Sequence, residues 1–278
     1  MTPDSWPLTD RDAFRGAVRG WLRESWDPAL TVRQWWGRLA DSGLTVPTWS
    51  KQLGGLSATS DLQLIVEDEL VAIGAVAPPI GSAGVRIVGP TLRQHASPAQ
   101  TSRLLRPVVR GEQAWCLLFR EPGGDLPNVT ARALRQASSW VVDGHKAYTT
   151  DVEMADRALL LAVTDAAVPA RRGLTCLILD MNQPGVEIGG GPDDEPNPQV
   201  VTLNSAVVGA DDVVGAIDGG WQVAQTALGY EQNSLSGRIR RGLVEALPGA
   251  PAGDLDRVVA DLIATHQARP APVDDRRV

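Results

Sequence analysis

Cysteine and histidine are scarce in this sequence. The 278 residues contain 2 cysteines and 3 histidines. Cys116 and Cys176 both lie inside apolar runs, a placement typical of small buried core residues rather than of disulfides or metal ligands. The histidines are dispersed without metal-ligand spacing; they are His95, His145 and His266. We therefore expect no disulfide framework and no metal site, and we assign none of the histidines a role.

Long apolar runs and an excess of positive charge are also missing. No stretch approaches the roughly 18 uninterrupted apolar residues that indicate a membrane-spanning helix, and the N-terminus lacks the basic-then-apolar pattern of a secretory signal. The net charge is −7, with the arginines scattered among acidic residues, which argues against a nucleic-acid surface. These features predict a soluble cytoplasmic protein that binds neither nucleic acid nor a membrane.

Common catalytic signatures are absent as well. The sequence contains no G-x-G-x-x-G motif, no P-loop lysine pattern and no nucleophile elbow, so dinucleotide-binding Rossmann, nucleoside triphosphatase and hydrolase functions have no motif support. Hydrophobic residues nevertheless make up 43% of the chain, which is enough for a substantial folded core.

The first 113 residues have a helical pattern. Phe14, Val18 and Trp21 recur at helical spacing, and Thr9 is placed to cap the helix that carries them. Five helices are expected, at Asp10–Leu22, Thr31–Ser42, Asp61–Ile73, Val85–Gln94 and Pro98–Arg110. We predict that residues 1–113 form an N-terminal all-helical domain.

The pattern changes near residue 114, where short apolar runs of strand length begin. These runs are Trp115–Phe119, Trp140–Val142, Ala158–Val163, Thr175–Leu179, Gly185–Ile188 and Val200–Leu203. Asp143-Gly144 predicts a hairpin, because a type I′ turn needs positive φ at both central residues, and His145 is then expected to be exposed beside the turn. A central β-barrel-like domain is predicted at 114–214.

A helical pattern resumes after Gly219. Val223, Ala227 and Tyr230 lie roughly one turn apart, and a further helix is expected at Leu255–Gln267. We predict a C-terminal helical domain at 215–278.

Two motifs between 114 and 150 identify a family resemblance. The first runs from Phe119-Arg120-Glu121 to Asp125, and the second runs from Asp143-Gly144-His145-Lys146 to Tyr148-Thr149-Thr150. They resemble the two flavin-facing segments of acyl-CoA dehydrogenases, which read F-S-E-P-G-A-G-S-D and N-G-Q-K followed by W-T-S. Similar runs occur in the same order over roughly residues 10 to 245. Examples are Gly43–Pro47, Gly54-Gly55, Val88–Leu92, Arg110–Glu112 and Pro184–Val186.

The resemblance implies an α+β, acyl-CoA dehydrogenase-like fold, with an N-terminal helical domain, a central β domain and a C-terminal helical bundle. Because the sequence ends after two helices of that bundle, we expect the bundle to be incomplete. Two helices with apolar inner faces need to be covered. The chain is therefore expected to associate as a homo- or hetero-oligomer with another acyl-CoA dehydrogenase subunit.

The resemblance also implies FAD as the cofactor and assigns residues to it. The implied flavin contacts are Leu117, Phe119, Arg120, Tyr148, Thr149 and Thr150. Arg120 occupies the position of a small hydroxyl residue in the family. Its guanidinium either faces the flavin or its phosphates, or it fills a pocket that no longer holds flavin or forms an ion pair across it, with Glu121 or with an acidic residue of a partner.

The implied substrate is an acyl-CoA. Gly124, Asp125 and Gln232 are its implied contacts, and Glu231 matches a family position that can carry the catalytic base. Removal of an α-proton requires a carboxylate in a dry pocket. Gln232 replaces an arginine that many family members have.

Three functions are compatible with this sequence. The first is FAD-dependent α,β-desaturation of a fatty or steroid side-chain acyl-CoA, with electron-transfer flavoprotein as the electron acceptor. The second is a non-catalytic partner subunit in a heteromeric acyl-CoA dehydrogenase. The third is an acyl-CoA-binding module without flavin.

Overall fold

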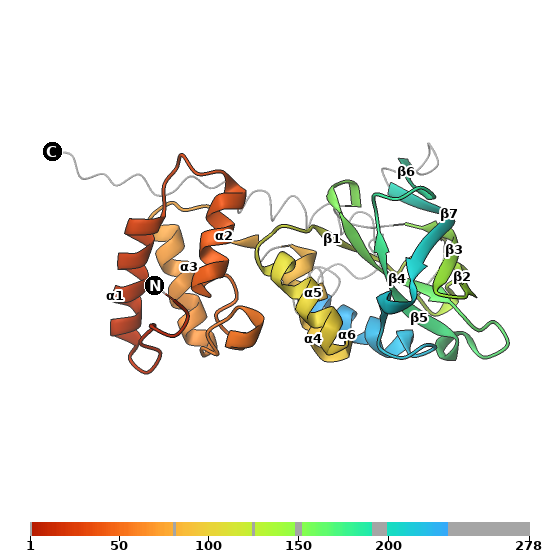
Figure 1. Ribbon diagram of the computed structural model, residues 1–278, viewed down its shortest axis with the longest axis horizontal. Helices are drawn as coiled ribbons and strands as arrows, with labels where there is room; N and C mark the ends of the chain where they lie inside the picture. Colours follow the sequence, from red (N-terminus) through yellow and green to blue (C-terminus); the bar gives the residue numbers. More distant parts are fainter. Residues whose placement is uncertain (1, 80–81, 124–125, 148–151, 191–198, 233–278) are drawn as a thin grey trace, which may run out of the picture. The chain divides into compact units, whose positions relative to one another are not determined.

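The computed structural model describes residues 2–79, 82–123, 126–147, 152–190 and 199–232 (Figure 1). By its internal contacts the chain separates into one unit at 1–227 and a second at 228–278. The first unit contains helices followed by a β sheet and the start of one more helix. The expected helix at Leu255–Gln267 lies outside the described residues.

Five α-helices occupy the N-terminal part and confirm the expected ones. They are α1 (Arg11–Ser25), α2 (Val32–Ser42), α3 (Ser60–Ala72), α4 (Gly89–His95) and α5 (Pro98–Val109). The helix expected at Val85–Gln94 is composite, because a π-helical turn, Gly84–Val88, precedes α4. The cap of α1 is Asp10 rather than Thr9: its carboxylate accepts the free N–H groups of Asp12 and Ala13, which a carboxylate does well at a helix N-terminus.

Tryptophans dominate the core of α1 and α2. The rings of Trp21 and Trp35 stack with centroids 6.0 Å apart, and Trp26 meets Trp35 edge-on at 4.8 Å. Trp6 packs edge-on against Phe14 at 5.8 Å. Such aromatic pairs bury large apolar areas in preferred geometries, so this part of the chain has a defined core of its own.

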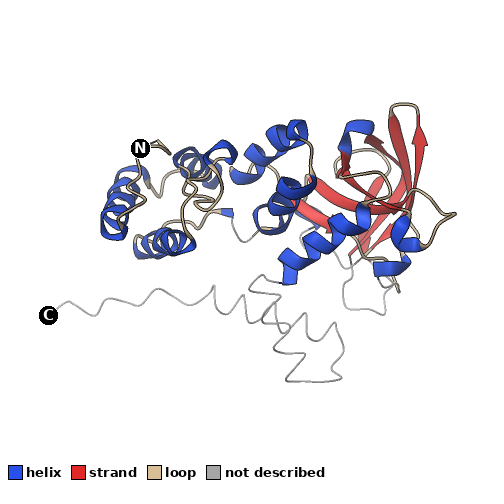
Figure 2. Ribbon diagram, turned by 90° about the horizontal axis from the view of Figure 1, so that it is seen from below, coloured by secondary structure: helices blue, strands red, loops and turns tan. Residues whose placement is uncertain are grey.

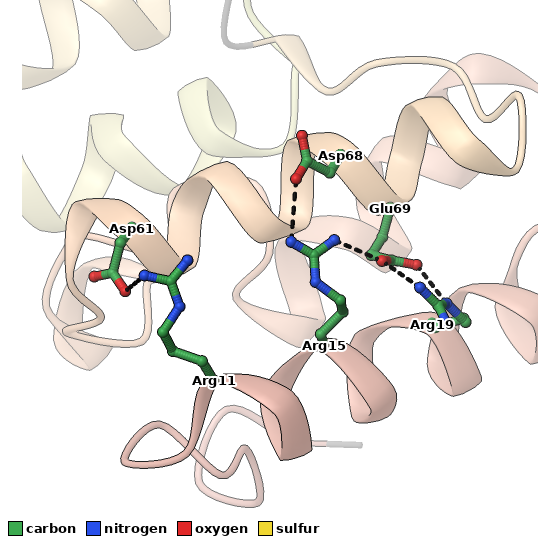
Figure 3. Close-up of polar contacts among 6 residues, drawn as sticks. All are labelled: Arg11, Arg15, Arg19, Asp61, Asp68 and Glu69. Atoms are coloured by element: carbon green, nitrogen blue, oxygen red, sulfur yellow. Dashed lines mark hydrogen bonds and ion pairs between the residues drawn. The ribbon is translucent and has the colours of Figure 1, made fainter.

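Helices α1 and α3 are joined by a row of ion pairs (Figure 3). Arg11, Arg15 and Arg19 of α1 face Asp61, Asp68 and Glu69 of α3. Glu69 is the buried member, with 3% of its side chain exposed, and it accepts hydrogen bonds from Arg15 and Arg19 at 2.8–2.9 Å. Hydrogen bonding from Arg19 lowers the pKa of the Glu69 carboxyl, against the opposing effect of burial.

The central part is an 8-stranded sheet (Figure 2) in the order β6-β7-β3-β2-β4-β5-β8, with β1 paired in parallel to β4. The strands are β1 (Trp115–Leu118), β2 (Arg132–Gln136), β3 (Ser139–Lys146), β4 (Arg157–Val163), β5 (Leu174–Asp180), β6 (Val186–Gly190), β7 (Gln199–Gly209) and β8 (Val213–Val214). The core of this part lies along β4 and β5, whose central residues are all buried. Cys116 and Cys176 are both buried in it, as expected, and burial raises the pKa of the Cys176 thiol to about 12.

The hairpin predicted at Asp143-Gly144 is wrong. β3 continues through both residues, and the turn between β2 and β3 lies at Ala137 and Ser138 instead. Opposite Asp143, β7 has a bulge in which Ser205 adopts φ 54°, and the Asp143 carboxylate accepts the Ser205 N–H at 2.7 Å. The aspartate therefore stabilises a backbone irregularity in the neighbouring strand rather than a turn in its own. His145 is exposed, but it lies within the strand.

Helix α6 (Gly220–Gln232) follows the sheet. A side chain at Gly220 would come within 2.6–2.8 Å of the main chain of β5 at Leu174–Cys176, so glycine permits the close approach of helix and strand. His95 of α4 hydrogen-bonds to Thr226 of α6 at 2.8 Å, and burial lowers the pKa of the His95 imidazole. The start of α6 is thus fixed to both a strand and a helix.

None of the helices in the described ranges is long and apolar enough to cross a membrane. Within the same ranges, no group of three or more His, Cys, Asp or Glu side chains could hold a metal ion.

Candidate flavin-facing site

The ends of β1 and β3 lie next to each other. The Ala147 N–H, directly after β3, donates to the Arg120 carbonyl, two residues after the end of β1, at 3.0 Å. A main-chain hydrogen bond therefore joins the first predicted flavin-facing motif to the second. Tyr148, Thr149, Thr150, Gly124 and Asp125 lie outside the described residues.

Three predicted flavin contacts can be located on this first segment. Leu117 is half-buried, whereas its neighbours Cys116 and Leu118 are fully buried in the sheet core. Phe119 is also buried, with 2% exposed. Arg120 is half-buried and has no ion-pair partner among the described residues. This segment thus has a half-buried apolar side chain at Leu117 and a half-buried cation at Arg120.

The alternative in which Arg120 pairs with Glu121 is not what the structure contains. The Glu121 carboxylate instead accepts a hydrogen bond from Lys146 Nζ at 2.8 Å. It also accepts from the Thr130 hydroxyl at 2.6 Å, the Thr130 N–H at 2.7 Å and the Ala131 N–H at 2.9 Å. Both carboxylate oxygens are occupied, which leaves the guanidinium of Arg120 for other groups.

No role was assigned to Lys146 from the sequence. In the structure its side chain is fully buried. Its Nζ donates to Glu121 and also to the Leu161 carbonyl of β4, at 2.6 Å. Burial lowers the pKa of the Lys146 ammonium, against the attraction of Glu121. Burial also tends to raise the pKa of the Glu121 carboxyl, but the charge and hydrogen bond of Lys146, with Thr130 and Ala131, hold it below its usual value.

A signal for this lysine was present in the strand pattern. Trp140 and Val142 alternate on the buried face of β3, and Lys146 falls on the same face at the same period of two. A lysine at an inward position requires a buried partner. The pattern therefore indicated that a partner exists, but it could not show which acidic residue would be there.

The described residues are chemically compatible with a flavin beside β1. Among the described residues, β1 pairs in parallel with β4. Leu117 offers an apolar surface to a planar ring, and the Arg120 guanidinium provides donors suited to carbonyl or phosphate oxygens. If FAD binds here, Leu117, Phe119 and Arg120 are the described residues that would hold it.

The predicted base and one substrate contact lie at the end of α6. Glu231 is half-buried and Gln232 is exposed. Both belong to the unit at 228–278. Their assigned roles stay predictions.

Comparisons with known proteins agree with the fold and the motifs. A family profile described as "Acyl-CoA dehydrogenase, N-terminal domain" matches residues 9–112, and one described as "Acyl-CoA dehydrogenase, middle domain" matches residues 120–199. Acyl-CoA dehydrogenase FadE34 of Mycobacterium tuberculosis is 32% identical over 237 residues, which cover 81% of this chain. The chain belongs to the acyl-CoA dehydrogenase family.

The chain is shorter than the curated relatives that it matches. The match covers 31% of the length of FadE34 and 64% of the length of acyl-CoA dehydrogenase IpdE1 of Mycobacterium tuberculosis, which is less than two thirds of either protein. The activity, substrates and partners of those proteins are therefore not transferred to it directly.

Solved structures share the fold. The structure of the Tcur3481-Tcur3483 steroid ACAD has a TM-score of 0.62 and 24% identity, and the match covers 92% of this chain and 73% of that one. The ChsE4-ChsE5 complex from Mycobacterium tuberculosis also has a TM-score of 0.62, with 22% identity, and the match covers 94% and 77%. At these identities the likeness shows the fold alone. The predicted acyl-CoA dehydrogenase-like fold, with N-terminal helices and a central β sheet, is confirmed.

Proposed function

We propose that this chain contributes to FAD-dependent α,β-desaturation of an acyl-CoA. Family membership supports the reaction class. The observation that carries the proposal for this chain is the hydrogen bond from the Ala147 N–H to the Arg120 carbonyl. It joins the two segments whose sequences match the flavin-facing motifs, so that residues from both can contact one cofactor.

The chain's own residues have separate roles in this proposal. FAD, when bound, supplies the acceptor for the hydride that leaves the substrate β-carbon. Leu117 and Phe119 provide apolar surface that keeps water away, and Arg120 orients an oxygen-bearing part of the cofactor. Tyr148, Thr149 and Thr150 are proposed to complete the cofactor contacts.

Glu231 is proposed as the base that takes the α-proton from the acyl-CoA. Glu231 lies on α6 and is half-buried, and a carboxylate that is partly shielded from water suits a base. Gly124, Asp125 and Gln232 are proposed substrate contacts. Electron-transfer flavoprotein is the proposed electron acceptor.

The proposed substrate class is an acyl-CoA with a fatty or a steroid side chain. One of the solved structures with this fold is a steroid ACAD, so a steroid side-chain acyl-CoA is one of the substrates to test. Desaturation assays with a steroid side-chain acyl-CoA and with a fatty acyl-CoA of similar side-chain length distinguish the two. Turnover of neither substrate would reject the proposed class.

A second candidate is a subunit that acts only in a mixed assembly. The specific observation in its favour is Arg120, which occupies the position of a small hydroxyl and has no ion-pair partner among the described residues. A related fold occurs in the ChsE4-ChsE5 complex, which is named for two different proteins. In this case a second acyl-CoA dehydrogenase subunit would complete the site.

The first experiment is an absorbance spectrum of the purified chain, alone and co-expressed with an acyl-CoA dehydrogenase subunit encoded by a neighbouring gene. A flavin band near ~450 nm, a property of the cofactor, in the chain alone supports direct catalysis. A flavin band that appears only when the partner subunit is co-expressed supports the mixed assembly. Acyl-CoA binding without any flavin would replace both proposals by a binding module.

Glu231→Gln then tests the base. We expect loss of desaturation with the flavin spectrum retained, because the substitution removes the proton acceptor and keeps the side-chain shape. Glu187→Gln is the matched control: it makes the same chemical change at an exposed residue of β6. Unchanged turnover in Glu231→Gln would reject Glu231 as the base.

A further inference from the structure

Lys146 and Glu121 form a buried ion pair in this sheet, and burying an ion pair is energetically unfavourable unless both charges are well paired. The Lys146 side chain is 0% exposed and that of Glu121 is 7% exposed. Each charge loses favourable hydration when it is taken out of water, and an apolar pair of similar volume is often at least as stable. Stability alone does not explain why both charges lie here.

The hydrogen bonds of the pair join four segments of the chain. Lys146 ends β3 and reaches β4 through the Leu161 carbonyl. Glu121 lies within the first flavin-facing segment and accepts hydrogen bonds from Thr130 and Ala131, which lead into β2. Each oxygen of the carboxylate has at least two donors. The carboxylate is therefore held in one position by groups that approach from different directions.

A close backbone approach sets up this geometry. A side chain at Gly144 would lie 2.6 Å from the Cα of Ala131, and Gly144 has φ 147°, which favours glycine. Two residues later, Lys146 points to the same buried face of β3. The glycine thus lets β3 come close to the segment that donates to Glu121.

Both ends of the pair lie next to residues of the proposed site. Glu121 directly follows Phe119-Arg120, and Lys146 directly precedes Ala147, whose N–H bonds to the Arg120 carbonyl at 3.0 Å. The ion pair and this backbone hydrogen bond together tie the main chain at 119–121 to the main chain at 146–147. A shift of either segment would break both.

We propose that Lys146 and Glu121 are positioning residues, which fix the main chain at Phe119-Arg120 against the end of β3 and thereby set the geometry of the flavin site. The link to flavin rests on the proposed function. The fixing of the main chain rests on the contacts themselves, so the two parts can be tested separately.

The main test compares the full chain with the double variant Glu121→Gln/Lys146→Met, which removes both charges without leaving one unpaired. The readouts are amide hydrogen exchange of peptides that contain Phe119, Arg120 and Ala147, and titration with FAD followed by flavin absorbance and fluorescence. We expect loss of exchange protection in these peptides and FAD affinity weaker by about tenfold or more, because small displacements of positioned groups have large effects.

Glu69→Gln is the matched control. Glu69 is also a buried carboxylate paired with cations, but it lies in α3, which contributes none of the predicted flavin contacts. We expect this variant to retain exchange protection at Phe119, Arg120 and Ala147 and to retain FAD affinity. Equal loss of protection in both variants would show general loosening and overturn the proposal.

Glu121→Asp provides a second variant if the double variant does not fold. It keeps the charge but shortens the side chain by one carbon, so that Lys146 and Thr130 can no longer both be reached at hydrogen-bond distance. Intermediate protection is expected, and protection and FAD affinity equal to those of the parent chain in this variant would overturn the proposal. If the parent chain binds no FAD, alone or with a partner, the proposed function fails, while hydrogen exchange still decides whether the pair fixes the main chain.

Discussion

Glu69 and Glu121 show how differently two buried carboxylates can be supported in one chain. Glu69 is paired with Arg15 and Arg19, whose side chains are 35% and 48% exposed. Glu121 is paired with Lys146, which is 0% exposed, and with backbone donors. The arginines of the first site can turn to water if their partner is lost, whereas Lys146 cannot. Loss of the buried carboxylate is therefore tolerated between α1 and α3 and poorly tolerated at the ends of β1 and β3.

The largest effect is expected from Glu121→Gln alone. It leaves the Lys146 ammonium buried without a counter-charge, which costs about 3–5 kcal/mol of the free energy of unfolding. Urea denaturation followed by circular dichroism measures it. The double variant with Lys146→Met should recover part of the loss, and a double variant less stable than Glu121→Gln would contradict this account.

Glu69→Gln should have a smaller effect. The amide still accepts a hydrogen bond from one arginine, and the other can be hydrated, so we expect a loss of about 1–2 kcal/mol. The same denaturation experiment compares the two sites directly. A loss as large as that of Glu121→Gln would remove the distinction based on solvent access of the cations.

The pH dependence of stability sharpens the comparison further. The pKa values of Glu69 and Glu121 are both held below their ordinary value of 4.5 in the folded chain, so each contributes stability above that pH and loses it as the pH falls through the lowered pKa. We expect the urea midpoint to decrease below pH 4.5. Glu69→Gln removes one of the two contributions and should make the decrease shallower. An unchanged slope would mean that Glu69 does not titrate with folding.

The smallest effect is expected at the exposed end of the same row of ion pairs. Arg11 and Asp61 are 64% and 42% exposed, so water and salt screen their attraction. Arg11→Gln, which leaves the interaction of Asp61 with Thr59 in place, should leave the denaturation midpoint unchanged within error. A measurable destabilisation would show that the four ion pairs between α1 and α3 act together rather than separately.

Much of the helical part could be predicted from the sequence. Periodic apolar residues located α1, α2, α3 and α5, because each of these helices has buried apolar residues. Those of α1, α2 and α3 form a common core. The precise cap of α1 was missed, since Thr9 and Asp10 are both good caps and local geometry selects between them.

The sheet was harder to predict. β2 was missed because four of its five residues are exposed and Ala133 is its buried one, so it carries no apolar run. Asp143-Gly144 has the residues of a tight turn, but their properties are used for a bulge in the neighbouring strand and for a close approach to Ala131. Local residue preferences are the same in both uses, and the pairing of distant strands decides between them.

The sequence by itself determined the family, the order of the helices and of most strands, and the two segments that are predicted to face a flavin, because these depend on periodicity and on short motifs. The tertiary structure decided which groups surround those segments. The partner of Glu121 is Lys146, 25 residues away, and the anchors of α6 are His95 and the main chain of β5. These contacts join residues far apart in the chain, and their energies depend on burial, which the folded structure alone defines.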